Sequence, residues 1–235
     1  FQNIFLSPEI DFLIEDLETS DKASSILKKQ EGSYSDLYFN YSINQDLRDK
    51  KFRTESGYVT TFSQELPLIS DSSELSNAFT ITNYKKLSST SDMVGKMSFF
   101  GKTITGLSDD VRISKRLNVP SSRLRGFQRG KVGPVENNDY IGGNHVTSLN
   151  FSATLPTIVQ GLDNLDVGIF LDAANIWGVD YDSSLDDKST LRSSTGVALN
   201  LMTPIGPLSF SFANALSKAS TDKTETFRFN LGTQF

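Results

Sequence analysis

The sequence predicts an all-β fold, an antiparallel transmembrane β-barrel of which this chain would hold the C-terminal portion, about ten strands. Segments of about ten residues alternate apolar and polar positions, the length and period of strands that cross a bilayer in a barrel. No apolar run approaches the length of about 18 residues that a transmembrane helix needs. A long loop punctuated by glycines, residues 106–144, lies between two such alternating segments.

Composition is compatible with this fold class and excludes others. The mean hydropathy is −0.28, but a barrel strand carries its apolar residues at every second position, so a polar average does not argue against a membrane protein. The net charge is −5, from 23 Lys plus Arg against 28 Asp plus Glu. These basic residues are scattered, so no nucleic-acid partner is expected. The chain has no Cys, which excludes disulfides and thiolate metal sites.

We expect residues 1–235 to form one domain, because all-β barrels of this length are usually single units. The chain starts at Phe1 without Met or a signal-type segment. We therefore expect it to be the C-terminal part of a longer exported precursor, with N-terminal barrel strands missing.

Strands in the N-terminal half are predicted from period-two alternation. The clearest example places Leu37, Phe39, Tyr41 and Ile43 on one face. The predicted strands of this half cover residues 3–18, 34–46, 57–66, 74–86 and 93–105.

Strands after the long loop alternate more strictly. In the last strand Phe227, Phe229, Leu231 and Phe235 share one face, opposite Arg228, Asn230, Gly232 and Gln234. On the apolar faces of the earlier strands of this half lies every second residue of four segments: Leu149 to Leu155, Val167 to Leu171, Val197 to Leu201 and Leu208 to Phe212. If the last strand ends in the periplasm, parity places loops 106–144, 175–190 and 216–224 outside, and turns 47–55 and 204–207 inside.

Alternating strands also build soluble sandwiches and lipocalin-like barrels, in which the apolar face covers a core. Here the opposite faces consist of Ser, Thr, Asn, Gln and charged residues. Such faces are too polar for a packed core, so the pattern favours lipid outside and water inside.

No catalytic, metal or cofactor site is predicted, and the chain is not expected to be an enzyme. The segment from Gly126 to Val132 has the wrong spacing for a phosphate loop and lacks its Ser or Thr. The acidic stretch from Asp180 to Asp187 has Leu185 where a calcium hand needs Gly, so it is interpreted as a solvated outer loop. His145 is the only histidine and has no nucleophile elbow near it.

Several motifs, in order and spacing, carry a resemblance to a known family. They are Leu124-Arg125-Gly126-Phe127, Gly142-Gly143-Asn144, Asp172 to Trp177, Pro204 to Leu208 and a final Phe-x-Phe-x-Leu-Gly-x-x-Phe. Together they resemble the C-terminal barrel of the BamA family, within the surface-antigen or BamA–TamA superfamily of bacterial outer-membrane proteins. The similarity runs from about Tyr34 to the end.

This resemblance implies a sixteen-stranded barrel preceded by periplasmic POTRA domains, with a function in folding and inserting outer-membrane proteins. The family's first and last strands pair loosely, and the seam between them is proposed to open so that client strands add by edge pairing. Here the closing strand and seam would include Phe227, Phe229, Leu231, Gly232 and Phe235. The implied partners are outer-membrane lipids, unfolded outer-membrane protein clients and accessory assembly lipoproteins.

In the family the long loop folds back into the lumen, which assigns Arg125, Gly126 and Phe127 as the lumen loop motif. Asp172 lies on the predicted inward face, where a carboxylate suits a guanidinium partner. The family commonly has an acidic residue where this chain has Asn150, so we expect one ionic partner for Arg125 instead of two. Further support for the loop is expected from Gly142, Gly143 and Asn144.

Two alternatives remain open at this point. The chain could be a sister translocator, either TamA-like or a two-partner secretion transporter, because the Arg-Gly-Phe loop is shared across that superfamily. It could also be a plain porin, which would conduct small solutes steadily through an unobstructed lumen.

Overall fold

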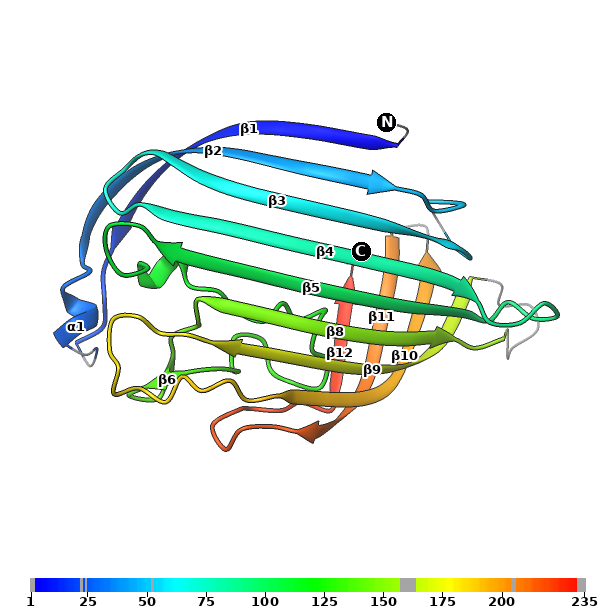
Figure 1. The fold of residues 1–235 in the computed structure, drawn as a ribbon. Coiled ribbons are helices and arrows are strands. Elements are labelled where there is room, and N and C mark those ends of the chain that lie inside the picture. The colour runs from blue at the N-terminus through cyan, green and yellow to red at the C-terminus, as the bar shows by residue number, and fades with distance from the viewer. Residues whose placement is uncertain are drawn as a thin grey trace.

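The computed structural model describes residues 3–21, 23, 25–51, 53–156, 164–203 and 206–231. Ten antiparallel strands form one sheet, and sequential strands are neighbours throughout (Figure 1). They are β1 (Ile4–Leu17), β2 (Gly32–Asp46), β3 (Gly57–Ser70), β4 (Glu74–Lys86), β5 (Val94–Gly106), β8 (His145–Thr154), β9 (Leu165–Trp177), β10 (Arg192–Thr203), β11 (Gly206–Ser217) and β12 (Phe227–Leu231). The predicted all-β meander is confirmed.

The remaining elements are short and lie in the connections. They are α1 (Ser25–Lys28), the 3-10 turn η1 (Ile113–Lys115), and the ribbon of β6 (Val135–Glu136) and β7 (Asp139–Tyr140). In the described part of the chain, no helix has the length and apolar character needed to cross a bilayer.

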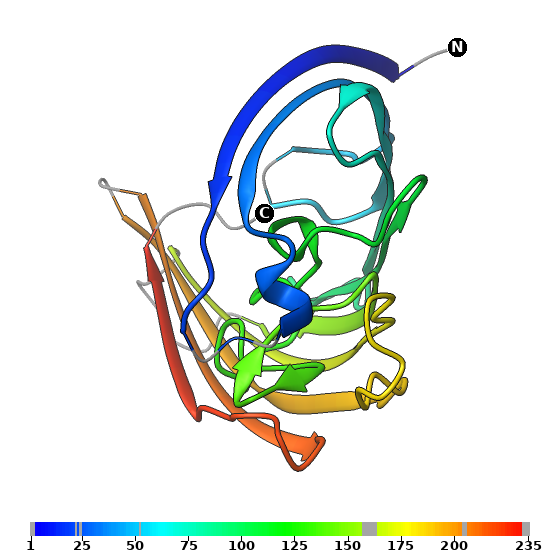
Figure 2. The same ribbon diagram turned by 90° about the vertical axis from the view of Figure 1, so that its left-hand side faces the viewer.

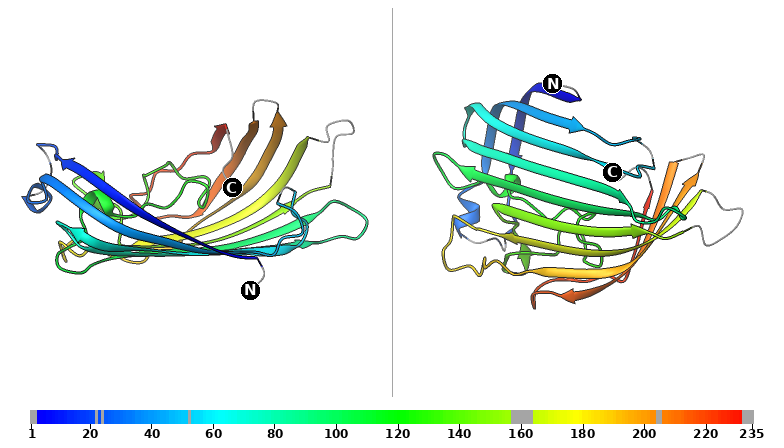
Figure 3. Two further views of the ribbon diagram at one scale, coloured as in Figure 1. Left: turned by 90° about the horizontal axis from the view of Figure 1, so that it is seen from above. Right: turned by 45° about the vertical axis from the view of Figure 1, so that its right-hand side comes forward.

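The sheet curls around a concave interior, as the end-on view shows (Figure 2), and the same curvature is visible from two further sides (Figure 3). β1 and β12 are its two edges. β5 and β8 pair directly with each other although residues 107–144 separate them in sequence. The chain between them lies within the concave side of the sheet (Figure 2).

Strand register separates an apolar outward face from a polar inward face. One outward row across β4, β5, β8 and β9 consists of Ile81, Phe99, Leu149 and Ala173. The adjacent inward row consists of Thr82, Ser98, Asn150 and Asp172. Phe99 is 38% exposed although it is large and apolar, whereas Asp172 is fully buried. This inversion of the usual burial pattern is typical of a barrel strand with lipid on its outer side.

Phenylalanines cover the outward side of the last two strands. Phe210 faces Phe229 and Phe212 faces Phe227, each with ring centroids 5.1 Å apart. Such aromatic cross-strand pairs stabilise an antiparallel ladder beyond the area they bury. Phe227, Phe229 and Leu231 are about half exposed. The predicted seam residues Gly232 and Phe235, and the turn residues 204–205, lie outside the described residues.

Two expectations need correction. β3 continues to Ser70 instead of ending at residue 66, because a β-bulge opposite Leu37 and Tyr38 shifts the register and lets the consecutive apolar residues Leu68 and Ile69 stay in the strand. The interior is also not wholly hydrated, since apolar side chains are buried on the concave side. Those from the strands are Ile104, Val146, Ala174 and Ile176.

The two faces of β10 should respond differently to an added charge. Val197 points outward at the middle of this strand and is 40% exposed, whereas Asn200 points inward. We expect Val197→Lys to destabilise the protein by about 2–4 kcal/mol, because it places an ammonium in hydrocarbon, and Asn200→Lys to cost less than about 1 kcal/mol. Urea titration of the full-length protein in phospholipid vesicles measures both. Equal effects would contradict the assignment of the faces.

Candidate functional site

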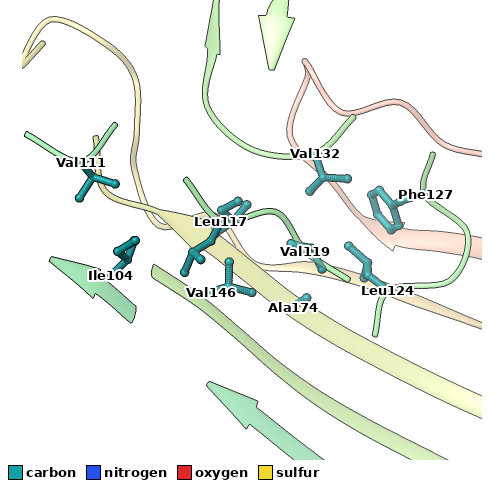
Figure 4. Packing of buried hydrophobic residues seen from close by; sticks show 10 residues of the cluster. Ile104, Val111, Leu117, Val119, Leu124, Phe127, Val132, Val146 and Ala174 are labelled. Carbon is teal, nitrogen blue, oxygen red and sulfur yellow. The ribbon is translucent and has the colours of Figure 1, made fainter. Parts of the chain in front are cut away.

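The connection between β5 and β8, residues 107–144, is called the lumen loop here. It packs against the inward face of the sheet through a buried apolar cluster, the loop core, most of which Figure 4 labels. The loop contributes Val111, Leu117, Val119, Leu124, Phe127 and Val132, which meet Ile104, Val146, Ala174 and Ile176 from β5, β8 and β9. The loop core therefore holds the loop inside the curl by burial of apolar area.

Arg125 is fixed to β9 by its pairing with Asp172. The guanidinium donates from Nε to Oδ2 at 2.8 Å and from Nη2 to Oδ1 at 2.7 Å. The backbone N–H of Arg125 also donates to Oδ2, at 3.1 Å. Asn150 on β8 donates its side-chain amide to Asp172 Oδ1 at 2.9 Å. The carboxylate is fully buried, so it needs this set of donors to offset its desolvation.

The guanidinium of Arg125 also stacks on Phe170. Its Cζ lies 3.5 Å from the centre of the ring, in a cation–π arrangement. Phe170 in turn lies over Gly196 of β10, where a Cβ would approach the ring to 2.8 Å and the carbonyl oxygen of Phe212 to 2.0 Å. A larger residue at position 196 would therefore displace the surface on which Arg125 rests.

Gly126 and Phe127 lie against β10 and β11. Gly126 has φ +86°, and a Cβ there would lie 3.0 Å from the Cβ of Ala213 and 3.4 Å from that of Ser194. Ser194 donates its hydroxyl to the carbonyl oxygen of Arg125. Phe127 is 1% exposed, within the loop core. The Arg-Gly-Phe segment thus needs Gly at its centre, both for its backbone conformation and for close approach to the sheet.

The tip of the lumen loop also pairs with the connection between β11 and β12. Phe127 forms a β-bridge with Thr224, and Glu225 N–H donates to the carbonyl oxygen of Gly126 at 3.0 Å. Arg228 on β12 donates to the carbonyl oxygens of Ser121 and Phe127. The position of the loop is therefore tied to the last described strand.

A second buried ion pair supports this connection. Arg192, at the start of β10, donates from Nε and Nη2 to Asp222 at 2.9 and 3.2 Å. Asp222 also accepts the N–H of Gly133 and that of Ala219. Both side chains of the pair are at most 4% exposed. The pair joins β10, the β11–β12 connection and the lumen loop.

The Gly142-Gly143-Asn144 segment supports a different part of the loop from Arg125. Gly143 forms a bridge with Leu117, and Asn144 accepts from Arg116 Nη1 at 3.0 Å and donates to Asp180 Oδ2 at 2.9 Å. Arg116 also donates to Asp180 Oδ1. Asp180, the first residue of the acidic stretch predicted to be a solvated outer loop, therefore contacts the lumen loop, although its side chain is 30% exposed.

The sequence-predicted residues thus fall into two groups in the structure. Arg125, Asp172 and Asn150 are in one contact network, whereas Gly142, Gly143 and Asn144 are in another. Asn150 contacts Asp172 and the carbonyl oxygen of Arg123, and the ion pair of Arg125 within the described residues is with Asp172. No three acidic, His or Cys side chains converge as a metal site would require anywhere in the described ranges.

The comparisons with known proteins agree with this architecture. A curled antiparallel meander that is apolar outside and carries one of its own loops on its concave side has the architecture of part of a transmembrane β-barrel. The chain belongs to the Omp85 superfamily: the family model described as Omp85 superfamily domain matches residues 10–235. The protein is located in the bacterial outer membrane.

Two curated relatives of this chain carry the same name. The chain is 31% identical to the outer membrane protein assembly factor BamA of Neisseria meningitidis serogroup B and 30% identical to that of Neorickettsia risticii, each over 48% of this chain. These alignments cover 17% and 16% of the relatives, so the chain spans a small part of their length. The crystal structure of BamA from Haemophilus ducreyi lacking POTRA domains 1–3 has the same fold, with TM-score 0.74 and 24% identity over 84% of this chain and 42% of that one.

Gly196→Ala should disturb the surface under Arg125. Its Cβ would meet backbone of β11 as well as Phe170, and we expect a loss of about 1–3 kcal/mol, the usual cost of overpacking. Gly101→Ala is the matched control, because its Cβ would lie an ordinary 3.5 Å from the Phe99 ring. Unfolding midpoints in urea measure both variants. A control as destabilised as Gly196→Ala would contradict the packing argument.

The Asp180 contact should depend on pH. Burial raises the pKa of Asp180, but hydrogen bonds from Val111 N–H and Arg116 outweigh it, so the pKa lies below its ordinary value of 3.8. Because the folded-state pKa is depressed, the contact stabilises the loop above pH 3.8 and is lost as pH falls through the folded-state pKa. Hydrogen exchange at the Val111 amide, corrected for intrinsic rates, should show protection that falls in that range. Asp180→Asn should remove this dependence, and its persistence there would exclude Asp180 as the cause.

Proposed function

We propose that this protein is an outer-membrane protein assembly factor that folds and inserts β-barrel clients into the bacterial outer membrane. Membership in the Omp85 superfamily and the similarity to two outer membrane protein assembly factors support this function. The structural observation that carries the proposal is the Arg125–Asp172 lock, which holds the lumen loop against the strands that precede β12. This function requires no chemical step by the protein.

Clients are proposed to add at a lateral seam between the first strand of the complete barrel and the last. An unpaired strand edge in hydrocarbon is costly, because its N–H and C=O groups find no water there. A strand that offers its own edge as a template lowers this cost for an incoming strand. β12 is one edge of the described sheet, and the proposal assigns this template role to it and to the predicted seam residues Gly232 and Phe235.

The lumen loop is proposed to set the position of that edge. Arg228 is the link, because it belongs to β12 and donates to two carbonyl oxygens of the loop. The loop is in turn held by Asp172 on β9, which pairs with Arg125, and by Ser194 on β10. If the Arg125 lock opens, the loop tip can move and β12 loses a fixed support on its inward side.

The proposed partners follow from the faces of the sheet. The exposed apolar outward residues suit outer-membrane lipids, and the edge at β12 suits unfolded outer-membrane protein clients. Accessory assembly lipoproteins are proposed from the resemblance to the BamA family alone. A porin function is disfavoured, because the loop core occupies part of the concave side that a porin leaves open to water.

Arg125→Ala should impair client insertion more than it impairs folding of the barrel. The substitution leaves the buried Asp172 carboxylate without its cation, which costs about 3–5 kcal/mol for a buried pair, while the strand ladders remain paired. We expect client insertion by the reconstituted full-length protein in liposomes to fall about tenfold or more.

Arg129→Ala is the matched control, because Arg129 is an exposed arginine of the same loop. Heat-modified electrophoretic mobility reports whether each variant folds. Normal insertion rates with folded Arg125→Ala protein would rule out the proposed role of the lock.

A further inference from the structure

The start of the lumen loop is anchored to the N-terminal strands of the sheet, whereas Arg125 is anchored to β9. Arg112 is 2% exposed and donates to Asp36 on β2. Its Nη1 lies 3.4 Å from Glu15 Oε2 on β1, and its Nε lies 3.9 Å from Glu74 Oε1 on β4. One guanidinium therefore faces carboxylates from three strands, and we call this group the Arg112 anchor.

The carboxylates of the Arg112 anchor are well satisfied. Asp36 accepts from Ser70 at 2.6 Å, and Glu74 accepts from Tyr38 at 3.0 Å and from Ser72 at 2.8 Å. Asp36 and Glu74 are at most 1% exposed. Two buried carboxylates need a cation, and burial of such a group costs more than an apolar contact of the same size would. The anchor therefore specifies where the loop binds instead of simply adding stability.

Residues next to Arg112 reinforce the same attachment. Ser114 donates to Glu15 at 2.8 Å, and Ile113 N–H donates to the side chain of Gln30 at 2.9 Å. Lys115 lies 4.5 Å from the ring centre of Tyr38. Residues 112–115 thus contact β1, β2 and the connection between these two strands.

The tip of the loop, Arg125 to Phe127, is attached to β9, β10 and β12. The lumen loop consequently crosses the concave side from the strands at the N-terminal end of the sheet to those at its C-terminal end (Figure 2). Between the two attachments lies the loop core, whose side chains are at most 8% exposed. Packed interiors resist compression and extension, so this loop has the properties of a spacer.

We propose that the lumen loop is a strut that sets the separation between β1–β4 and β9–β12, with Arg112 as the positioning residue of its second attachment. The strut requires both attachments, the Arg112 anchor and the Arg125–Asp172 lock. Loss of either one leaves the loop docked on one side of the sheet only. This inference concerns the geometry of the sheet and does not depend on the proposed assembly function.

Distance measurements by double electron–electron resonance test the strut directly. The chain has no Cys, so spin labels can be placed at Lys29→Cys, beside the Arg112 anchor, and Lys218→Cys, in the β11–β12 connection. Both lysines are exposed. In the full-length protein in liposomes, Arg112→Gln should broaden or shift the distance distribution between the labels. Arg129→Gln removes an exposed charge from the same loop and should leave the distribution unchanged.

The distance distribution of Arg112→Gln distinguishes a strut from a residue that only stabilises the nearby strands. If Arg112 only stabilised β1–β4, Arg112→Gln would lower the unfolding midpoint without changing the label separation, and this outcome would overturn the proposal. Arg112→Lys keeps the charge and should restore part of the narrow distribution.

If Arg112→Gln does not fold, Glu15→Gln decides the matter, because Glu15 is 24% exposed and contacts both Arg112 and Ser114. A broadened distribution with this variant supports the strut, and an unchanged one rejects it.

Discussion

The lumen loop depends on charge pairing between its arginines and carboxylates elsewhere in the chain. Apolar burial in the loop core stabilises the docked loop but does not fix its position, because the hydrophobic effect is not directional. Three arginines of the loop fix its position, since each donates to one particular aspartate. The pairs are Arg112 with Asp36, Arg116 with Asp180 and Arg125 with Asp172. Hydrogen bonds between a guanidinium and a carboxylate are directional, and Arg125 makes two of them to Asp172. Apolar burial and the arginine–aspartate pairs together hold the long loop in one position on the concave side.

The sheet accommodates the loop because its inward face is shaped for it. Small residues line β10 and β11 under the Arg-Gly-Phe segment, where Ser194 and Ala213 let the backbone of Gly126 approach closely and Gly196 leaves room for Phe170. At the outer ends of β5, β8 and β9 the inward residues are Ile104, Val146 and Ile176, which give the loop an apolar surface. The same sheet is therefore polar inside where it is open and apolar inside where the loop covers it.

Strand periodicity was sufficient to predict the meander and to place Asp172 on the inward face, because a side chain's face follows from its parity along the strand. It could not find Arg112, Arg116 or Arg192. Their carboxylate partners are 76, 64 and 30 residues away, and a loop has no period from which docking follows. A signal was nevertheless present: Ile104, Val146 and Ile176 break the polar pattern of the inward face at one end of three neighbouring strands. Such a patch indicates that a segment of the chain covers it.

Arg228 binds the loop only through backbone atoms, so this contact leaves the loop residues that it reaches free to vary. Its acceptors are the main-chain oxygens of Ser121 and Phe127, and every amino acid carries such an oxygen. Mutational drift at position 121 can therefore proceed without releasing β12, provided that the backbone path is kept. The arginine itself has no such freedom, because Lys lacks the planar fork that reaches two carbonyls at once.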